Sequence, residues 1–151
     1  MRIVADTSVL IALSDIDRLN LLKALFGSVI VPQAVAEEYG EPLPSWIEVR
    51  RPRNYSLVES LLDKLHRGEA EAIALALELG DAIVALDDKK ARKTARKLGL
   101  RVIGTLGILI LAEKRGLITS LEEEIHRLLN TSFRLSPSVV AEALRRAKQD
   151  C

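Results

Sequence analysis

Three aspartates stand where apolar runs of the chain end, and their positions suggest chemistry. Asp6 follows the run Ile3-Val4-Ala5, and Asp87 and Asp88 follow the run from Ala82 to Leu86. Runs of this length and composition are typical of strands that are buried on both faces. In an open parallel sheet the carboxyl ends of the strands lie at one edge, where ligands bind. We therefore expect these three carboxylates to share that edge.

Two glutamates are predicted to reach the same edge from helices. Glu71 lies in the first turn of a helix expected from Glu69 to Leu79, which must run antiparallel to the strand after it. Glu69 itself is expected to point to the opposite side of that helix. Glu38, next to Glu37, lies in the last turn of a helix, where carboxylates oppose the macrodipole. Each acid also has a simpler interpretation as a helix cap, a first-turn acid or a solvated surface charge.

Several carboxylates at one edge repel each other and raise each other's pKa, and a divalent cation removes that conflict. The single cysteine is Cys151, and the two histidines, His66 and His126, are expected on the surface away from the acids. Oxygen ligands alone select a hard cation. The acids therefore predict a site for Mg²⁺ or Mn²⁺.

The segment after Asp88 is strongly basic. Between residues 89 and 101 it carries seven bases and no acid, namely Lys89, Lys90, Arg92, Lys93, Arg96, Lys97 and Arg101. A solvated helix face is the simpler interpretation, but a segment that begins at the acidic edge also suits a phosphate backbone crossing a metal site. Lys89, Arg92 and Thr105 are candidates for binding phosphate oxygens, although Thr105 could equally cap its helix.

The elements that would position these residues alternate along the chain. Strands are expected at about 3–5, 28–31, 46–50, 82–86 and 101–103, with helices between them. This alternation predicts an α/β fold, a three-layer α/β/α sandwich around a parallel sheet of about five strands. We expect one domain over residues 1–151, in which amphipathic helices at about 121–129 and 137–148 form a C-terminal extension over residues 119–151.

Length and composition suit one globular domain. The 151 residues are 48% hydrophobic and 28% charged, and the net charge of +1 gives no global attraction to a polyanion. The longest apolar stretch, Val102 to Ala112, contains two glycines and is too short to span a bilayer. With a lone cysteine and no leader-like segment, we expect a cytoplasmic protein without a membrane partner.

Four segments in order resemble the PIN-domain family of metal-dependent ribonucleases. They are Asp6-Thr7-Ser8, Val31-Pro32-x-x-Val35-x-x-Glu38, Gly68-Glu69-Ala70-Glu71-Ala72-Ile73 and Leu86-Asp87-Asp88-Lys89-Lys90-Ala91-Arg92. The continuation from Val102 to Leu109 and the segment Ser132 to Ser136 are similar to a little-characterised branch of that family. The resemblance covers nearly the whole chain. It implies a Rossmann-like parallel sheet and an acidic pocket that holds one or two Mg²⁺ or Mn²⁺ ions.

The resemblance also assigns roles by position. Asp6, Glu38, Glu71 and either Asp87 or Asp88 match the acids that bind metal and catalyse in the family. Ser8 matches the polar residue that follows the first aspartate by two, and we expect it to bind substrate. The third acid is commonly an aspartate, so here the longer glutamate must reach from one turn into its helix. The last acid often comes later relative to its strand, which leaves two aspartates as alternatives.

The function implied by the resemblance is hydrolysis of RNA. Many members are VapC-type toxins silenced by an antitoxin, and others process ribosomal RNA. We expect a Mg²⁺- or Mn²⁺-dependent endoribonuclease that is the toxin of a type II toxin–antitoxin pair, with RNA, a small antitoxin protein and a second copy of the chain as partners. The alternatives are an RNA-processing nuclease without an antitoxin, and a weakly active or inactive PIN-fold module that binds RNA or protein. A haloacid-dehalogenase-like phosphatase is disfavoured because Ser8 stands where a second aspartate is needed.

Overall fold

The structure, a computed structural model, describes residues 1–149 and contains the predicted α/β alternation. The strands are β1 (Arg2–Ala5), β2 (Ser28–Pro32), β3 (Ile47–Arg50), β4 (Ala82–Ala85) and β5 (Val102–Ile103). The helices are α1 (Thr7–Asp15), α2 (Leu21–Phe26), α3 (Gln33–Tyr39), α4 (Tyr55–Leu61), α5 (Arg67–Leu79), α6 (Lys89–Lys97), α7 (Thr105–Lys114), α8 (Leu121–Leu129) and α9 (Pro137–Gln149). The five predicted strands agree with the observed ones to within one residue at each end.

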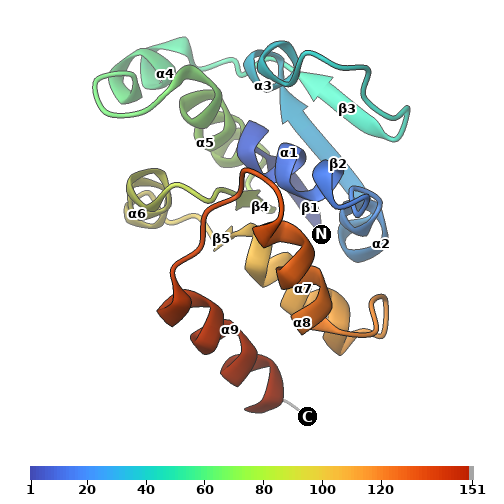
Figure 1. The fold of residues 1–151 in the computed structure, drawn as a ribbon. Coiled ribbons are helices and arrows are strands. Elements are labelled where there is room, and N and C mark those ends of the chain that lie inside the picture. The colour runs from blue at the N-terminus through green and yellow to red at the C-terminus, as the bar shows by residue number, and fades with distance from the viewer. Residues whose placement is uncertain (150–151) are drawn as a thin grey trace.

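All five strands lie in one parallel sheet with the order β3-β2-β1-β4-β5 (Figure 1). From β1 the chain adds β2 and β3 on one side, and it then crosses to the other side to add β4 and β5. The strand order therefore reverses between β1 and β4. In folds of this kind, ligands bind at that reversal, outside the carboxyl ends of the strands.

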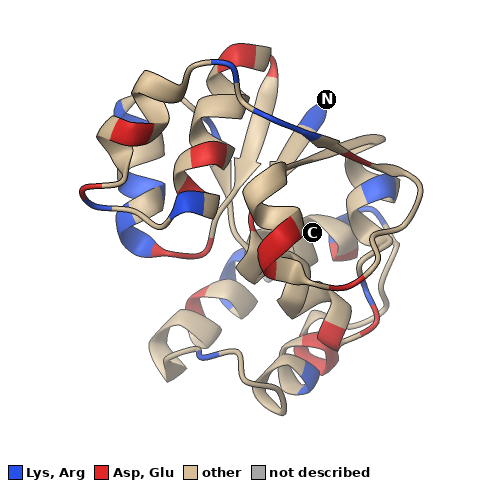
Figure 2. Cartoon of the chain, turned by 90° about the horizontal axis from the view of Figure 1, so that it is seen from above, with Lys and Arg blue, Asp and Glu red and all other residues tan. Residues whose placement is uncertain are grey.

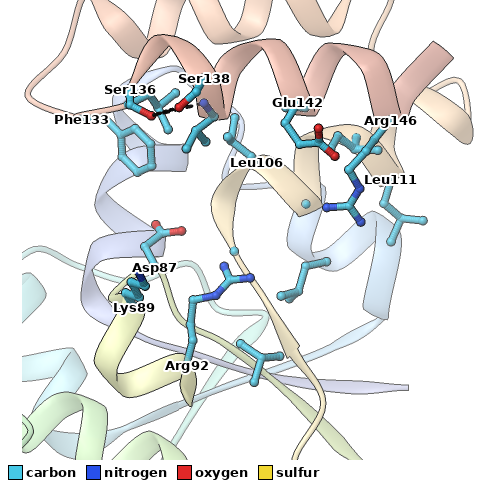
Figure 3. A pocket seen from close by; sticks show the side chains of 18 of the residues that line it. Asp87, Lys89, Arg92, Leu106, Leu111, Phe133, Ser136, Ser138, Glu142 and Arg146 are labelled. Atoms are coloured by element: carbon cyan, nitrogen blue, oxygen red, sulfur yellow. Dashed lines mark hydrogen bonds between the residues drawn. The ribbon is translucent and has the colours of Figure 1, made fainter. Parts of the chain in front are cut away.

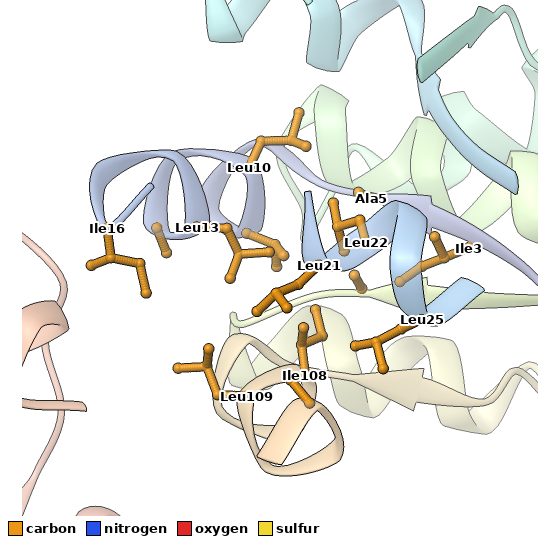
Figure 4. Close-up of a cluster of buried hydrophobic side chains, with 14 of the residues drawn as sticks. Ile3, Ala5, Leu10, Leu13, Ile16, Leu21, Leu22, Leu25, Ile108 and Leu109 are labelled. Atoms are coloured by element: carbon orange, nitrogen blue, oxygen red, sulfur yellow. The ribbon is translucent and has the colours of Figure 1, made fainter. Parts of the chain in front are cut away.

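Helices cover both faces of the sheet, which confirms the predicted three-layer sandwich. On β1, Ile3 and Ala5 face a core shared with α1, α2 and α7, and Figure 4 shows part of it. Val4 faces the opposite core, which α5 and α6 close. All three side chains are fully buried, which explains why this central strand is a continuous apolar run rather than an alternating one.

The last two helices pack beside α7 rather than on the sheet (Figure 1). Glu124 of α8 is buried and accepts two hydrogen bonds from Arg18, from Nε to Oε1 at 2.9 Å and from Nη2 to Oε2 at 3.0 Å. Arg127, whose Nη1 lies 3.3 Å from the same carboxylate, also donates to the carbonyl oxygen of Ile16 at 2.6 Å. These bonds tie α8 to the connection between α1 and α2. Of the helices within residues 1–149, none is long and apolar enough to cross a membrane.

Candidate functional site

The pairing of β1 with β4 brings the first and last predicted acids together. Ala5 is in register with Ala85, and the backbone N–H of Asp6 donates to the carbonyl oxygen of Ala85 at 3.1 Å. Asp6 and Asp87 therefore leave adjacent strands at the same edge. This edge is the point at which the strand order reverses, where the fold leaves a crevice.

The acids surround an open pocket of about 460 Å³ at this edge. The residues that line it are Asp6, Thr7, Ser8, Ile11, Glu38, His66, Glu69, Asp87 and Asp88. Four of the five predicted acids and the exposed Ser8 are therefore brought together. Within the described part of the chain no lysine or arginine lines this pocket, while bases crowd the helix that follows Asp88 (Figure 2).

Asp6 is buried, with 5% of its surface exposed, although it carries an ionisable group. It occupies the N-cap position of α1, but its side chain makes no capping hydrogen bond, so the helix-cap interpretation fails for this residue. The pKa of the Asp6 carboxyl is raised to about 7, chiefly by burial and also by the charges of Glu69, Glu38 and Asp87, against a hydrogen bond from the Thr7 backbone that lowers it. The pocket thus holds an acid that strongly favours a nearby positive charge.

Glu38 reaches the pocket because α3 is short. The helix starts directly after β2 and ends at Gly40, whose φ of +70° is favourable for glycine and stops the helix. Glu38 is therefore in the last turn, above the sheet edge, and its side chain is exposed. The Thr7 hydroxyl donates to its Oε2 at 3.2 Å, which fixes the carboxylate beside the start of α1.

The third acid of the pocket is Glu69, and the prediction that Glu71 faces it is wrong. Glu71 points at the start of α3, where its Oε1 accepts a hydrogen bond from the backbone N–H of Ala34 at 3.2 Å. It is buried, and Arg67 Nη1 lies 3.8 Å from its other oxygen. Because the N-cap residue of α3, Pro32, has no capping side chain, Glu71 supplies an acceptor for that helix from a neighbouring element.

Glu69 has a local reason for its position. It is the third residue of α5, and its Oε1 accepts from the backbone N–H of His66 at 3.1 Å in a capping box. Burial raises the pKa of Glu69, with Asp88 and Glu38 raising it further, while the His66 backbone bond and charge lower it. The three-residue spacing from His66 to Glu69 is that of a capping box and could have indicated the position of Glu69 from the sequence. The pattern is weak here because histidine is not a preferred N-cap residue.

Gly68 leaves the space in which two of these carboxylates meet. A Cβ atom at this position would lie 2.7 Å from Glu38 Oε1 and 3.3 Å from Asp6 Oδ1. Any other residue would therefore fill the pocket or displace its acids. Glycine is favoured here by the close approach of side chains and not by an unusual backbone conformation.

The two adjacent aspartates differ in what they bind. Asp88 caps α6, because its Oδ2 accepts from the backbone N–H of Ala91 at 2.9 Å. Asp87 accepts from the backbone N–H of Thr105 at 2.8 Å and from its hydroxyl at 2.6 Å, which ties the end of β4 to the start of α7. Thr105 is fully buried and its hydroxyl is used by Asp87, so the prediction that it grips a phosphate is not supported.

The predicted phosphate-binding bases lie beside the acidic pocket and not inside it. Lys89 is exposed, while Arg92 is half-buried and donates from Nη1 to the carbonyl oxygen of Leu86 at 3.3 Å. Both line a second depression, which Asp87 borders as well. Asp87 therefore stands between an acidic pocket and a basic one.

Comparison with known proteins identifies the family. A sequence model of the PIN domain matches residues 2–149. The chain belongs to the PIN-domain family. PIN domains are generally nucleases and typically use divalent metals.

No curated protein matches the chain. Among solved structures it is similar to a PilT N-terminus domain protein from the hyperthermophilic archaeon Sulfolobus solfataricus. The two are 19% identical, the similarity covers 90% of this chain and 100% of the other, and the TM-score is 0.45.

The donor chemistry of this PIN domain fits a hard divalent cation, but its acids are not gathered on one point. Among the described residues, no three His, Cys, Asp or Glu side chains are close enough together to hold a metal ion. Glu38 and Asp88 are exposed at the rim, and Asp6 is buried beneath them with a raised pKa. His66 also lines the pocket, contrary to the expectation that both histidines lie away from the acids. Carboxylate oxygens nevertheless dominate the lining, which favours Mg²⁺ or Mn²⁺.

Proposed function

We propose that this PIN domain is a cytoplasmic, Mg²⁺- or Mn²⁺-dependent endoribonuclease that hydrolyses phosphodiester bonds of RNA. The observation that supports it most is the environment of Asp6, which is buried among other acids in a pocket that no described lysine or arginine lines. Folding leaves this carboxylate desolvated without a compensating positive charge. A divalent cation supplies that charge and also attracts phosphate.

Asp6 and Asp87 or Asp88 are the residues that would hold the ion, and Glu38 and Glu69 would complete the acidic set. When bound, such an ion lowers the pKa of a coordinated water and neutralises charge on the phosphate oxygens. Glu69 takes the place that the sequence assigned to Glu71, since it is Glu69 that lines the pocket.

The other side chains of the site orient these groups. Thr105 holds both oxygens of Asp87, and Glu71 supports the start of α3, whose last turn carries Glu38. Ser8 is exposed at the pocket and can donate to a substrate oxygen. Lys89, exposed at the start of α6, is placed to attract a phosphate next to the one that is cleaved.

The decisive experiment measures cleavage of single-stranded RNA by Asp6→Asn with Mn²⁺ present and with EDTA. We expect activity to fall more than about 100-fold, since even the partners behind metal ligands commonly contribute about 10- to 100-fold. Asp15→Asn is the matched control, because Asp15 is exposed at the other end of the same helix. Undiminished cleavage by cleanly purified Asp6→Asn would end this proposal.

Among the roles of PIN domains we propose that of a type II toxin, with a small antitoxin protein and a second copy of the chain as partners. The resemblance of the four acidic segments to PIN-domain ribonucleases, many of which are VapC-type toxins, supports it. Growth arrest on expression of the chain, relieved by co-expression of a small open reading frame beside its gene, tests the toxin role. An RNA-processing nuclease would cleave RNA without such relief, and a binding module would retain RNA in Mn²⁺ without cutting it.

A further inference from the structure

A groove of about 910 Å³ runs between α6, β5, α7 and α9, next to the acidic pocket. Asp87 lines both depressions, so the groove continues from the acids. Its lining includes Lys89, Arg92 and Arg96 from α6 and Arg146 from α9. Two elements that are far apart in the sequence therefore place positive charge on facing sides of one groove.

More bases than acids line this groove in the described part of the chain. Among the described residues, Arg92, Arg96 and Arg146 form no ion pair with a carboxylate, and Glu142, which also lines the groove, pairs with Arg145 instead. Burial lowers the pKa of the Arg92 guanidinium, and the charges of Arg96 and Arg146 lower it further, against Asp87. Figure 3 shows Arg92 and Arg146 extending from opposite sides toward the same space. Like charges held together in this way attract an anionic ligand.

The groove also has an apolar part of its lining, which includes an aromatic ring. Phe133 and Leu135 precede α9, Leu106 belongs to α7, and Val139 of α9 is an exposed hydrophobic residue. Figure 3 places the ring of Phe133 at the groove beside Ser136, on the side where Asp87 and Lys89 lie. Aromatic and apolar surfaces stack the bases of single strands, while arginines hold their phosphates.

We propose that this groove binds single-stranded RNA on one side of the cleaved phosphate, with Arg96 and Arg146 holding backbone phosphates and Phe133 stacking a base. The inference rests on the proposed function, because it takes RNA to be the substrate. An acidic polypeptide would satisfy the arginines as well, but continuity with the acidic pocket at Asp87 favours a ligand that spans both depressions.

The test measures binding apart from cleavage. Fluorescence anisotropy with a labelled ten-nucleotide oligouridylate in EDTA compares the wild-type chain with Arg96→Glu and Arg146→Glu. Lys93→Glu is the matched control, since Lys93 is an exposed base of the same helix that does not line the groove. We expect the groove variants to weaken binding about 10-fold or more and to flatten the dependence of the dissociation constant on salt. The control should change it less than about threefold.

A second variant tests the stacking contact. Phe133→Leu keeps apolar volume against the core, with which Phe133 also packs, and removes the aromatic face. We expect a loss of roughly fivefold or more in affinity, with an unchanged salt dependence.

The outcomes separate this inference from the proposed function. Equal weakening by Lys93→Glu and the groove variants would overturn the groove as the binding path, even if the chain cleaves RNA. Binding of an acidic decapeptide is measured in parallel. Groove variants that lose affinity for the peptide but keep affinity for RNA would show that the groove is a polypeptide site and overturn the proposal. If the groove variants lose RNA binding and the wild-type chain does not cleave RNA with Mn²⁺, the groove proposal is supported and the nuclease proposal is contradicted.

Discussion

Two buried carboxylates of this chain have opposite surroundings. Glu124 is 3% exposed and Asp6 is 5% exposed, so water solvates neither well. Glu124 receives two hydrogen bonds from Arg18 and lies beside Arg127. Asp6 is surrounded by other acids, and its pKa rises to about 7. The chain neutralises one buried charge by itself and leaves the other to be neutralised from outside.

The contrast separates structural charge from functional charge. A buried ion is tolerated when partners inside the fold compensate its lost hydration, and Glu124 meets that condition. Asp6 does not meet it, so the metal-free chain carries the cost of an acid that folding has desolvated. Such a cost at the point where the strand order reverses is expected of a site that binds a cation.

The largest effect is expected from removing a partner of Glu124. Arg18→Met leaves this carboxylate buried with one guanidinium, and we expect the free energy of unfolding to fall by about 3 kcal/mol. Urea denaturation followed by circular dichroism measures it. Arg2→Met is the matched control, because Arg2 pairs with the exposed Asp81, and it should have little effect. Equal losses in the two variants would show that burial of Glu124 does not matter.

The next effect has the opposite sign. Asp6→Asn should make the metal-free chain more stable at pH 8, by about 2 kcal/mol. The rise in pKa from 3.8 to about 7 corresponds to about 4 kcal/mol, and we expect burial of the new amide to cancel about half of that gain. The folded chain keeps the Asp6 proton up to about pH 7, whereas the unfolded chain loses it near its ordinary pKa of 3.8. The stability that the folded wild-type chain gains by keeping the Asp6 proton is therefore complete below pH 3.8 and is lost as the pH rises through 7.

Urea denaturation in EDTA at pH 4.5 and pH 8 checks this sign. The advantage of Asp6→Asn over the wild-type chain should be small at the lower pH and grow toward the higher one. An advantage that shrinks as the pH rises would contradict the raised pKa.

A smaller stabilisation is expected from the cation itself. Mn²⁺ at ten times its dissociation constant should add about 1.4 kcal/mol to the wild-type chain. For a domain of this size that is a rise of about 3–6 °C in melting temperature, which differential scanning fluorimetry detects. Asp6→Asn should show no rise, and Asp15→Asn should show the full one. A full rise in Asp6→Asn would place the cation elsewhere.

The smallest effect distinguishes the two glutamates of α5. Glu71→Ala removes the acceptor for Ala34 at the start of α3 and should cost about 1 kcal/mol of stability. Glu69→Gln keeps an acceptor for its capping bond and should instead weaken Mn²⁺ binding, as followed by the shift in melting temperature. If Glu71→Gln weakened the metal and Glu69→Gln did not, the original assignment of Glu71 would stand.

The sequence was enough to predict the sheet and most of the pocket. Strands β1, β2 and β4 are apolar runs because they are buried, and an acid at the end of such a run has only one edge of a parallel sheet to occupy. That argument placed Asp6, Asp87 and Asp88 correctly. Glu38 followed from the short helix that comes directly after β2.

What the sequence did not predict depends on contacts between distant elements. The segment from Gly68 to Ala76 of α5 is buried all round, so its apolar residues do not indicate which face carries an acid to the pocket. The bond between Asp87 and Thr105 joins two elements 18 residues apart. The approach of Arg146 to Arg92 requires α9 to pack beside α7, which no periodicity reveals.

The central position of β1 determines when the acidic pocket can form during synthesis of the chain. Asp6 is made first, but β4, one of the two neighbours of β1 in the sheet, is made much later, and the Asp87 side chain accepts its hydrogen bonds from Thr105. Contacts between residues so far apart in sequence form late in folding. A nascent chain shorter than about residue 105 therefore contains the first acid but no complete pocket. The pocket is therefore complete only after most of the chain has been made.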